Sequence, residues 1–340
     1  MILLIYGCGS MATRIAALAC AAGFDVVLAG RPSARLVEAA ERLNLPWRAS
    51  GTVDPEDLDA MLSDVKIVCN TAGPFAHTAA GLMRACLRNG CHYLDLSNEA
   101  TTFEDAWSLD SDARKVGVSL VPGAGFGTAA VEALAAHLIG RIKEPASLTI
   151  VRTNGGGART VGVSRTMLEI LALPGAGIKD GRWSAQDCRI TGFNLPDGRL
   201  TGIPVALGDA FAVAQATGIR QVTAYSTTRM NLLSARLALP LVRTLAKTTR
   251  GGPHRSTREG RKTRGSDVDY TQIWIRATNA HGETKASYLR GRSGSELAAR
   301  IALHAIQQLR NRTSSGSFTA GKLIGTSNIL ALPGLRITDI

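Results

Sequence analysis

Three small residues near the start of the chain have the spacing of a diphosphate-binding turn. Gly7 and Gly9 follow an apolar run at residues 1–6, and Ala12 stands at the third small position of a G-x-G-x-x-G/A pattern. The first glycine permits a tight turn, the second lets a pyrophosphate approach the backbone, and the third allows a helix to pack closely on a strand. The amides at the start of that helix would face the phosphates. The predicted contacts are Gly7, Cys8, Gly9, Ser10 and Met11.

The end of the next apolar run, residues 25–29, indicates which dinucleotide this turn would bind. NAD sites carry Asp or Glu about 20 residues after the glycines, whereas NADP sites place a cation there. Here Arg31 and Ser33 follow the run and no carboxylate is in place. A guanidinium can hold a 2′-phosphate through two hydrogen bonds, and a serine hydroxyl can donate another. We therefore predict NADP(H) as the cofactor. The alternatives are that the glycine turn binds no nucleotide, that Arg31 is a solvated loop residue and that Ser33 only caps a helix.

Two further loops follow apolar runs and are rich in small or polar residues. The run at residues 66–70 leads into the letters NTAGPF, and the run at residues 117–121 leads into VPGAGFG. The carboxyl ends of parallel strands form the ligand crevice of an open α/β sheet, so both loops are expected beside the nicotinamide and its ribose. An ordinary glycine-rich turn is the alternative for VPGAGFG. The predicted cofactor contacts are Asn70, Thr71, Gly73, Pro74, Phe75, Gly125 and Phe126.

Three residues of the predicted crevice, Tyr93, Asp95 and His77, have side chains that can hold or move a proton. Hydride transfer needs the nicotinamide held close to an electrophilic carbon and a group that meets the developing charge. For an enoyl thioester, Tyr93, His77 or a backbone amide would donate to the carbonyl oxygen. For a protonated imine, a carboxylate such as Asp95 or Glu99 would stabilise the cation. The structural alternatives are a core position for Tyr93, capping or ion pairing for the carboxylates, and a helix-cap or surface position for His77.

Strands and helices alternate through the first third of the chain, which would bring these loops to one edge of a sheet. This alternation predicts a parallel sheet with right-handed crossovers, and we expect a Rossmann doubly wound domain at residues 1–125. The expected strands are residues 1–6, 25–29, 47–50, 66–70, 92–96 and 117–121. The expected helices are residues 11–22, 33–43, 54–62, 77–88 and 102–115.

The alternation becomes irregular after residue 125, which predicts a second, mixed α/β (α+β) domain at residues 126–291. Residues 279–282 have the composition of a hairpin turn between two of its strands. Residues 292–340 begin with an amphipathic helix at residues 296–309. The strands expected in the second domain are residues 146–153, 188–193, 221–226, 270–278 and 284–290, with helices at 166–173 and 204–217.

The composition predicts a folded protein without a membrane span or a metal centre. Of the 340 residues, 45% are hydrophobic and 19% are charged, which allows a sizeable core. No apolar run reaches the ~20 residues that cross a bilayer, and no signal peptide is evident, so a cytoplasmic protein is expected. The six cysteines lack metal-ligand spacing and are expected to be thiols, with Cys69 a possible neighbour of the active site.

The net charge of +12 predicts an acidic partner. Nucleic acid is not expected, because aromatic residues make up only 5% of the chain and no recognition motif is present. A phosphorylated cofactor, coenzyme A or an acidic carrier protein explains the sign equally well. Residues 243–264 hold eight Lys or Arg and one Glu, which fits a solvated loop or a docking surface for such a partner. Arg152, Arg159 and Arg165 either grip a substrate carboxylate or phosphate or form a basic loop.

Several segments together resemble the saccharopine dehydrogenase-like reductases, in particular the trans-acting enoyl reductase branch. They are GCGSMATRIA, LAGRP, VCNTAGPF, ACLRNGCHYLDLSNE, VPGAGFG and, near the C-terminus, SFTAGKLIGTSNILALPGLRITD. The resemblance implies a Rossmann domain, an inserted mixed α/β domain, a closing segment (residues 292–340) that returns to the first domain, and NADP as cofactor. Two departures concern the substrate: the chain is shorter than is usual for the branch, and VSRTM stands where a Ser-Arg-Gly-Thr run is expected.

The sequence thus predicts an NADPH-dependent oxidoreductase that delivers hydride to an activated double bond. The leading substrate is the C=C bond of an enoyl thioester or similar conjugated acyl group, free or bound to coenzyme A or a carrier. The alternatives are a saccharopine-type reduction of a C=N bond and a non-catalytic NADPH-binding sensor. A homodimer is expected, with the sheet of the second domain as its contact surface.

Overall fold

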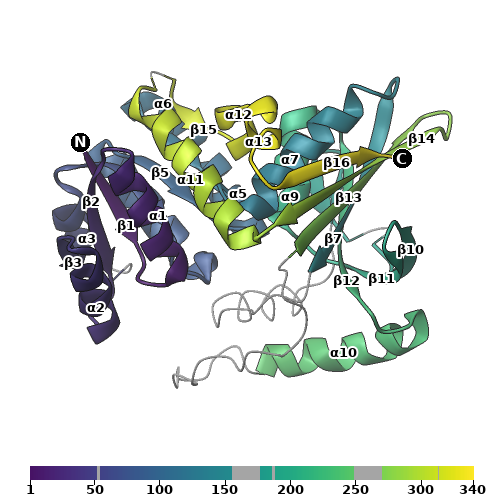
Figure 1. Ribbon diagram of the computed structural model, residues 1–340, viewed down its shortest axis with the longest axis horizontal. Coiled ribbons are helices and arrows are strands. Elements are labelled where there is room, and N and C mark those ends of the chain that lie inside the picture. The colour runs from purple at the N-terminus through teal and green to yellow at the C-terminus, as the bar shows by residue number, and fades with distance from the viewer. Residues whose placement is uncertain (52–53, 155–176, 186–187, 249–269, 313) are drawn as a thin grey trace. The chain divides into compact units, whose positions relative to one another are not determined.

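The computed structural model describes residues 1–51, 54–154, 177–185, 188–248, 270–312 and 314–340, which form two compact units (Figure 1). The first unit comprises Met1–Ala130 and Ser295–Ile329, and the second comprises Val131–Gly294 and Leu330–Ile340. The sequence predicts divisions after residues 125 and 291, and the structure divides the chain after residues 130 and 294. The segment expected to return whole to the first domain is shared, because its last residues add a strand to the sheet of the second unit.

The first unit contains the predicted parallel sheet. Its strand order is β15-β6-β5-β4-β1-β2-β3, and every neighbouring pair is parallel. The crossovers run in opposite directions from β1, which lies between β4 and β2 and is therefore the switch point where such sheets bind ligands. The Rossmann prediction is confirmed. The strands are β1 (Ile2–Tyr6), β2 (Asp25–Gly30), β3 (Trp47–Ala49), β4 (Val65–Asn70), β5 (His92–Asp95), β6 (Ser119–Val121) and β15 (Gly316–Ser317).

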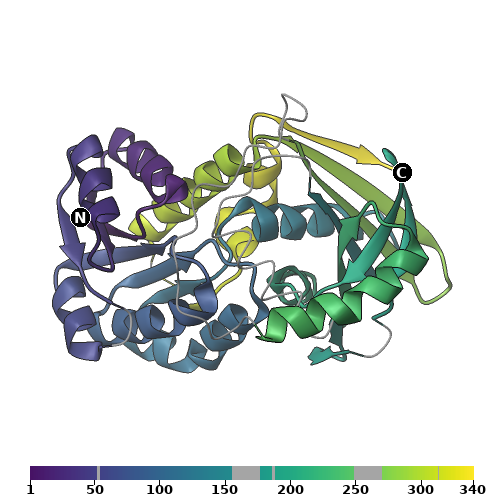
Figure 2. The same cartoon turned by 90° about the horizontal axis from the view of Figure 1, so that it is seen from below.

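Helices cover both faces of this sheet (Figure 2). On one face α11 lies beside α1, and Arg310 of α11 donates to the carbonyl oxygen of Gly23 at 2.8 Å and stacks on the ring of Phe24. The amphipathic helix expected at residues 296–309 thus belongs to the first unit. The helices are α1 (Ser10–Ala21), α2 (Ala34–Leu43), α3 (Pro55–Leu62), η1 (Phe75–His77), α4 (Ala79–Asn89), α5 (Ala100–Ser108), α6 (Asp110–Val116), α11 (Gly294–Arg310), α12 (Ala320–Ile324) and α13 (Thr326–Leu330).

The helix expected at residues 102–115 is divided into α5 and α6 at Leu109. The bend directs the carboxylate of Asp110 to β15, where one oxygen accepts from the amide of Ser317 at 2.7 Å and the other accepts from Arg114 at 2.8 Å. The contact of Asp110 with β15 joins residues 207 positions apart in the sequence, and local helix periodicity gave no sign of the break.

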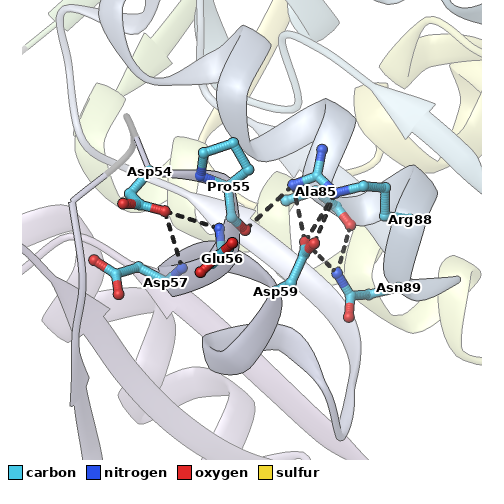
Figure 3. Close-up of polar contacts among 8 residues, drawn as sticks. All are labelled: Asp54, Pro55, Glu56, Asp57, Asp59, Ala85, Arg88 and Asn89. Atoms are coloured by element: carbon cyan, nitrogen blue, oxygen red, sulfur yellow. Dashed lines mark hydrogen bonds and ion pairs between the residues drawn. The ribbon is translucent and has the colours of Figure 1, made fainter.

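The helix-start signal at residues 54–56 is confirmed by the cap of α3 (Figure 3). One oxygen of Asp54 accepts from the amides of Glu56 and Asp57 at 2.9 and 3.4 Å. Further along α3, Asp59 binds Arg88 of α4 through both carboxylate oxygens, at 2.8 and 2.9 Å. These contacts join α3 to α4, and α4 leads from the loop after β4 to β5.

The second unit contains a mixed sheet in the order β10-β11-β12-β7-β13-β14-β16. β12 and β7 are parallel and the other pairs along this path are antiparallel. The predicted hairpin turn joins β13 to β14, whereas the strand expected at residues 188–193 begins at Thr191. α7 (Phe126–Ile139) begins in the first unit and ends in the second. The other elements are β7 (Pro145–Asn154), β8 (Gly177–Lys179), β9 (Arg182–Ser184), β10 (Thr191–Leu195), β11 (Gly198–Pro204), α9 (Gly208–Thr217), β12 (Gln221–Thr228), α10 (Leu232–Thr248), β13 (Tyr270–Asn279), β14 (Thr284–Arg292) and β16 (Leu335–Asp339).

Some sequence predictions for this unit lie outside the described residues: the helix at 166–173, Arg159, Arg165 and residues 249–264 of the basic stretch. Arg152 is described, and it forms an ion pair of 3.0 Å with the buried carboxylate of Asp209. Of the helices that the structure describes, none is long and apolar enough to cross a membrane.

Candidate active site at the carboxyl edge of the parallel sheet

The turn after β1 contains two glycines with different surroundings. Gly7 has a φ of +133°, and its amide donates to the carbonyl oxygen of Ala29 at 2.7 Å. A Cβ on Gly7 would stand 2.2 Å from Oγ1 of Thr71, so only glycine fits where the ends of β1, β2 and β4 meet. A Cβ on Gly9 would have no atom within 4 Å. Gly7 therefore serves the fold, whereas the space beside Gly9 is open.

The start of α1 beside Gly9 suits a diphosphate. Gly9 is the N-cap residue of α1, no side chain caps the helix, and its first turn holds no acidic residue. Gly9 and Ser10 are exposed, and Cys8 and Met11 are half-buried. Helix amides and the positive end of the helix dipole favour a phosphate at such a position. The residues present thus fit the group that the sequence predicts there.

Arg31 and Ser33 lie at the end of β2, the strand next to β1. Both residues are exposed, and in the part of the chain that the structure describes no ion pair involves Arg31. Oγ of Ser33 accepts from the amide of Leu36 at 3.3 Å, so this serine caps α2 and keeps its hydroxyl hydrogen for another acceptor. The cap that the sequence left as an alternative is therefore compatible with a bond to a 2′-phosphate.

Asn70, the last residue of β4, begins a hydrogen-bond network that fixes the loop after this strand. Its Oδ1 accepts from the amide of Ala72 at 3.0 Å, and its Nδ2 donates to Oγ1 of Thr78 at 3.0 Å. Thr78 donates in turn to the carbonyl oxygen of Ala72 at 2.8 Å. Nδ2 of Asn70 also donates to the hydroxyl of Tyr93 at 3.1 Å, which links this loop to β5.

Tyr93 and Asp95 continue the network and have no exposed surface. The hydroxyl of Tyr93 donates to Oδ2 of Asp95 at 2.8 Å. Oδ1 of Asp95 accepts from the amides of Ser97 and Gly123, at 2.9 and 2.8 Å. Strand alternation places residues 93 and 95 on one face of the sheet, and the pair connects the loops that follow β4, β5 and β6. Burial raises the pKa of the Tyr93 hydroxyl well above its usual value.

Burial also raises the pKa of Asp95 from 3.8 to about 6, against the opposing effect of its hydrogen-bond donors. An unfolded chain releases this proton from about pH 4, whereas the folded chain keeps it to about pH 6. The free energy of unfolding therefore falls as the pH rises from about 4 to about 6. The loss is about 1.4 kcal/mol for each unit by which the pKa of the folded state exceeds that of the unfolded state.

Asp95→Asn removes this titration, because the amide carries no charge at any pH. The lost bond from Tyr93 is an offset independent of pH, so we expect the variant to gain stability relative to the wild type between pH 4 and 6. Urea unfolding of both proteins from pH 4.5 to 7.5 measures the difference. A difference that stays constant over this range would contradict the assignment.

The loop after β4 is also held by Glu99. Its two carboxylate oxygens accept from the amides of Phe75 and Ala76, at 3.0 and 2.6 Å, and its own amide donates to Oγ of Ser97 at 3.0 Å. Glu99 is buried, so its negative charge is used inside the loop. Within the same loop Gly73 and His77 are exposed and Thr71, Pro74 and Phe75 are half-buried, with a cis peptide bond between Gly73 and Pro74.

The VPGAGFG loop contacts Asp95 through Gly123 rather than through its second glycine. Gly123 has a φ of +74° and donates its amide to the carboxylate. Gly125 is buried, and a Cβ there would lie 3.2 Å from Cδ2 of Leu96. Phe126, also buried, begins α7. The ordinary-turn alternative explains both glycines, and a cofactor contact from Gly125 or Phe126 stays a prediction.

The structure brings together some of the predicted residues and adds others. Asn70, Tyr93 and Asp95 form one network, and Thr71 packs against Gly7. Ser97 and Thr78 complete the network without having been predicted from the sequence, and Gly123 belongs to the predicted VPGAGFG loop but binds Asp95. The signal for Ser97 and Thr78 was weak, because small polar residues are common between strands and helices and their partners depend on the neighbouring strands.

The surroundings of Cys69 and the arrangement of possible metal ligands bear on two further sequence predictions. Cys69 is fully buried in β4, and burial raises the pKa of its thiol, which opposes formation of a reactive thiolate. Among the described residues, no group of three or more His, Cys, Asp or Glu side chains is arranged to hold a metal ion.

Comparisons with known proteins agree with this geometry. Residues 3–121 match the family described as Saccharopine dehydrogenase NADP binding domain. A protein of Arabidopsis thaliana described as a probable mitochondrial saccharopine dehydrogenase-like oxidoreductase is 32% identical over 111 residues, which cover 30% of this chain and 24% of that protein. A saccharopine dehydrogenase-like oxidoreductase of Bos taurus is 25% identical over 171 residues, 46% of this chain and 36% of that protein. The chain thus matches well under half of the length of either relative.

Solved structures with the same fold match nearly the whole chain. Saccharopine dehydrogenase (L-Glu forming) from Saccharomyces cerevisiae superimposes with a TM-score of 0.68 and 12% identity, over 100% of this chain and 99% of that chain. The homospermidine synthase of Legionella pneumophila, solved in complex with NAD, superimposes with a TM-score of 0.68 and 10% identity, over 99% of this chain and 92% of that chain. At these identities the likeness concerns the fold. The chain therefore has the saccharopine dehydrogenase fold, and its residues 3–121 match the model of the saccharopine dehydrogenase NADP binding domain.

Proposed function

We propose that the protein is an NADPH-dependent oxidoreductase that reduces an activated double bond. One observation carries the proposal: open space at Gly9 and the uncapped start of α1 lie at the switch point of an NADP-binding domain, and the neighbouring strand ends at an exposed Arg31. NADPH bound there would supply the hydride. The similarity to saccharopine dehydrogenase-like oxidoreductases from a plant and a mammal supports the same reaction class.

The buried network has a positioning role in this proposal. Tyr93 and Asp95 are fully buried and engaged with Asn70 and Gly123, so they hold the loops after β4 and β6 rather than contact the substrate. Of the three residues predicted to be catalytic, His77 is the exposed one. We therefore assign to His77 the contact with the substrate oxygen on which charge develops.

The leading substrate is an enoyl thioester or a similar conjugated acyl group, as in the trans-acting enoyl reductase branch. Reduction of a cationic imine would use a carboxylate, and the two carboxylates predicted from the sequence for this role are occupied. Asp95 accepts three hydrogen bonds, and Glu99 accepts two from backbone amides. The net charge of +12 suits a substrate carried on coenzyme A or on an acidic carrier. Imine reduction is the second candidate, because saccharopine dehydrogenase and homospermidine synthase have the same fold.

Loss of the reduced-nicotinamide absorbance, followed against two substrate panels, separates these reactions. We expect turnover with enoyl thioesters, and His77→Ala should lower kcat by ~100-fold while the unfolding temperature stays constant, within the range for general acid catalysts. Turnover only with pairs of an amine and a keto acid would favour imine reduction. Tight NADPH binding without turnover in either panel would favour the sensor.

The homodimer and the cytoplasmic location stay predictions, and the plant relative is described as mitochondrial.

A further inference from the structure

Three arginines from two strands of the second unit line one hollow. β14 and β16 lie side by side at one end of the mixed sheet (Figure 1), and Arg290 of β14 is the direct cross-strand partner of Arg336 of β16. Arg292 lies two residues further along β14, on the same face as Arg290. The three side chains line a cavity of about 230 Å³, together with Gly334 and Leu335. The cavity exceeds the ~30 Å³ share of one water several-fold.

The backbone at this hollow holds the arginines on a fixed frame. The amide of Arg292 donates to the carbonyl oxygen of Gly334 at 3.2 Å, and Gly334 has a φ of +91° at the turn that leads into β16. The ladder from Ser287 to Gly291 pairs residue by residue with Asp339 to Leu335. Arg290 and Arg336 therefore start from paired positions, and the bond to Gly334 fixes the backbone of Arg292 beside them.

Protection of a sheet edge does not account for this arrangement. Charged side chains on an edge strand discourage pairing with another chain, and this reason applies to Arg336 because β16 ends the sheet. It does not apply to Arg290 and Arg292, since β14 is paired on both sides, with β13 and β16. Edge protection therefore explains the charge of Arg336 but not the two arginines of β14 that share its hollow.

We propose that this arginine hollow (Arg290, Arg292 and Arg336) binds a phosphate monoester. A monoester carries close to two negative charges at neutral pH and offers three terminal oxygens, which matches three guanidinium groups better than a carboxylate with one charge and two oxygens. A phosphate of this charge has two available sources, the monoester of a nucleotide such as the adenosine 3′-phosphate end of coenzyme A, and free inorganic phosphate, which offers the same oxygens. The inference depends on the second unit alone, so it does not require the proposed function.

Calorimetric titration of the whole protein in chloride buffer without NADPH tests the proposal, because the 2′-phosphate of NADPH is itself a monoester and would compete with the probes. The probes are adenosine 3′,5′-bisphosphate and inorganic phosphate in separate arms. We expect saturable binding that falls by roughly tenfold in Arg290→Gln and in Arg336→Gln, since each removes a charge-assisted pair. A bisphosphate that binds much more tightly than phosphate identifies the nucleotide source, and equal affinities identify the free ion.

Arg182→Gln is the matched control, because Arg182 is an exposed arginine on β9 that does not line the hollow and its loss changes the net charge equally. Circular dichroism checks that each variant is folded. Absence of binding by both probes would overturn the proposal, and so would an equal loss of affinity in Arg182→Gln and the two hollow variants, which would indicate attraction by overall charge. Neither result bears on turnover of the double bond.

Discussion

Gly9→Ala is expected to weaken NADPH binding by tenfold or more while the protein stays folded. The added Cβ meets no atom of the chain within 4 Å, and Gly9 has a φ of −81°, which alanine adopts without strain. The loss of a glycine N-cap costs at most about 1 kcal/mol. The methyl group would instead occupy the space in which a diphosphate approaches the start of α1. Fluorescence titration with NADPH and thermal unfolding measure the two effects separately.

Gly7→Ala is the matched variant, and its main effect should be a loss of protein stability. The added Cβ would lie 2.2 Å from Oγ1 of Thr71 at a φ of +133°. Backbone strain and overpacking together are expected to cost about 2–5 kcal/mol of unfolding free energy, which denaturant titration measures. Unchanged NADPH affinity in Gly9→Ala would contradict the placement of the diphosphate. Equal destabilisation of the two variants would show that both glycines serve only the fold.

Arg31→Ala is expected to remove the preference for NADPH over NADH. Removing the guanidinium should raise the Kd for NADPH by ~10-fold or more, the usual effect of losing a charge-assisted hydrogen bond at an exposed site. The Kd for NADH should change little, because NADH has no 2′-phosphate for Arg31 to bind. The selectivity ratio of the variant should therefore approach one, as measured by fluorescence titration with both cofactors.

Arg35→Ala provides the control for this prediction. Arg35 is also exposed, near the start of α2, and its removal changes the net charge by the same amount. A parallel loss of NADPH affinity in Arg31→Ala and Arg35→Ala would indicate general attraction of a polyanion rather than a specific 2′-phosphate contact. Higher salt should then weaken binding to both variants equally.

Local pattern was sufficient to predict the parallel sheet and the turn at its switch point. β1, β2 and β4 are apolar runs that end at small or polar residues, and Gly7 and Gly9 have the spacing that a diphosphate requires. The same level of reasoning does not distinguish the two glycines. Their difference depends on Thr71, which lies 64 residues from Gly7 in sequence and is brought to it by the pairing of β1 with β4.

The burial and hydrogen-bond partners of Tyr93 and Asp95 could not be predicted from the sequence. Alternation along β5 places both on one face, but Leu94 on the other face is equally buried, so alternation does not say which polar groups meet Tyr93 and Asp95. Burial depends on the loops after β4 and β6, and the donors to Asp95 are backbone amides that any residue type supplies. A carboxylate after a strand thus indicated a functional edge, but its role depends on contacts that only the fold defines.

The position of the adenosine 2′-phosphate in a crystal structure of the NADP⁺ complex tests the central claim most directly. We predict that it lies within hydrogen-bonding distance of the Arg31 guanidinium, with the diphosphate against the backbone at Gly9. A 2′-phosphate directed away from Arg31, or a cofactor absent from the turn after β1 at saturating concentration, would contradict the account.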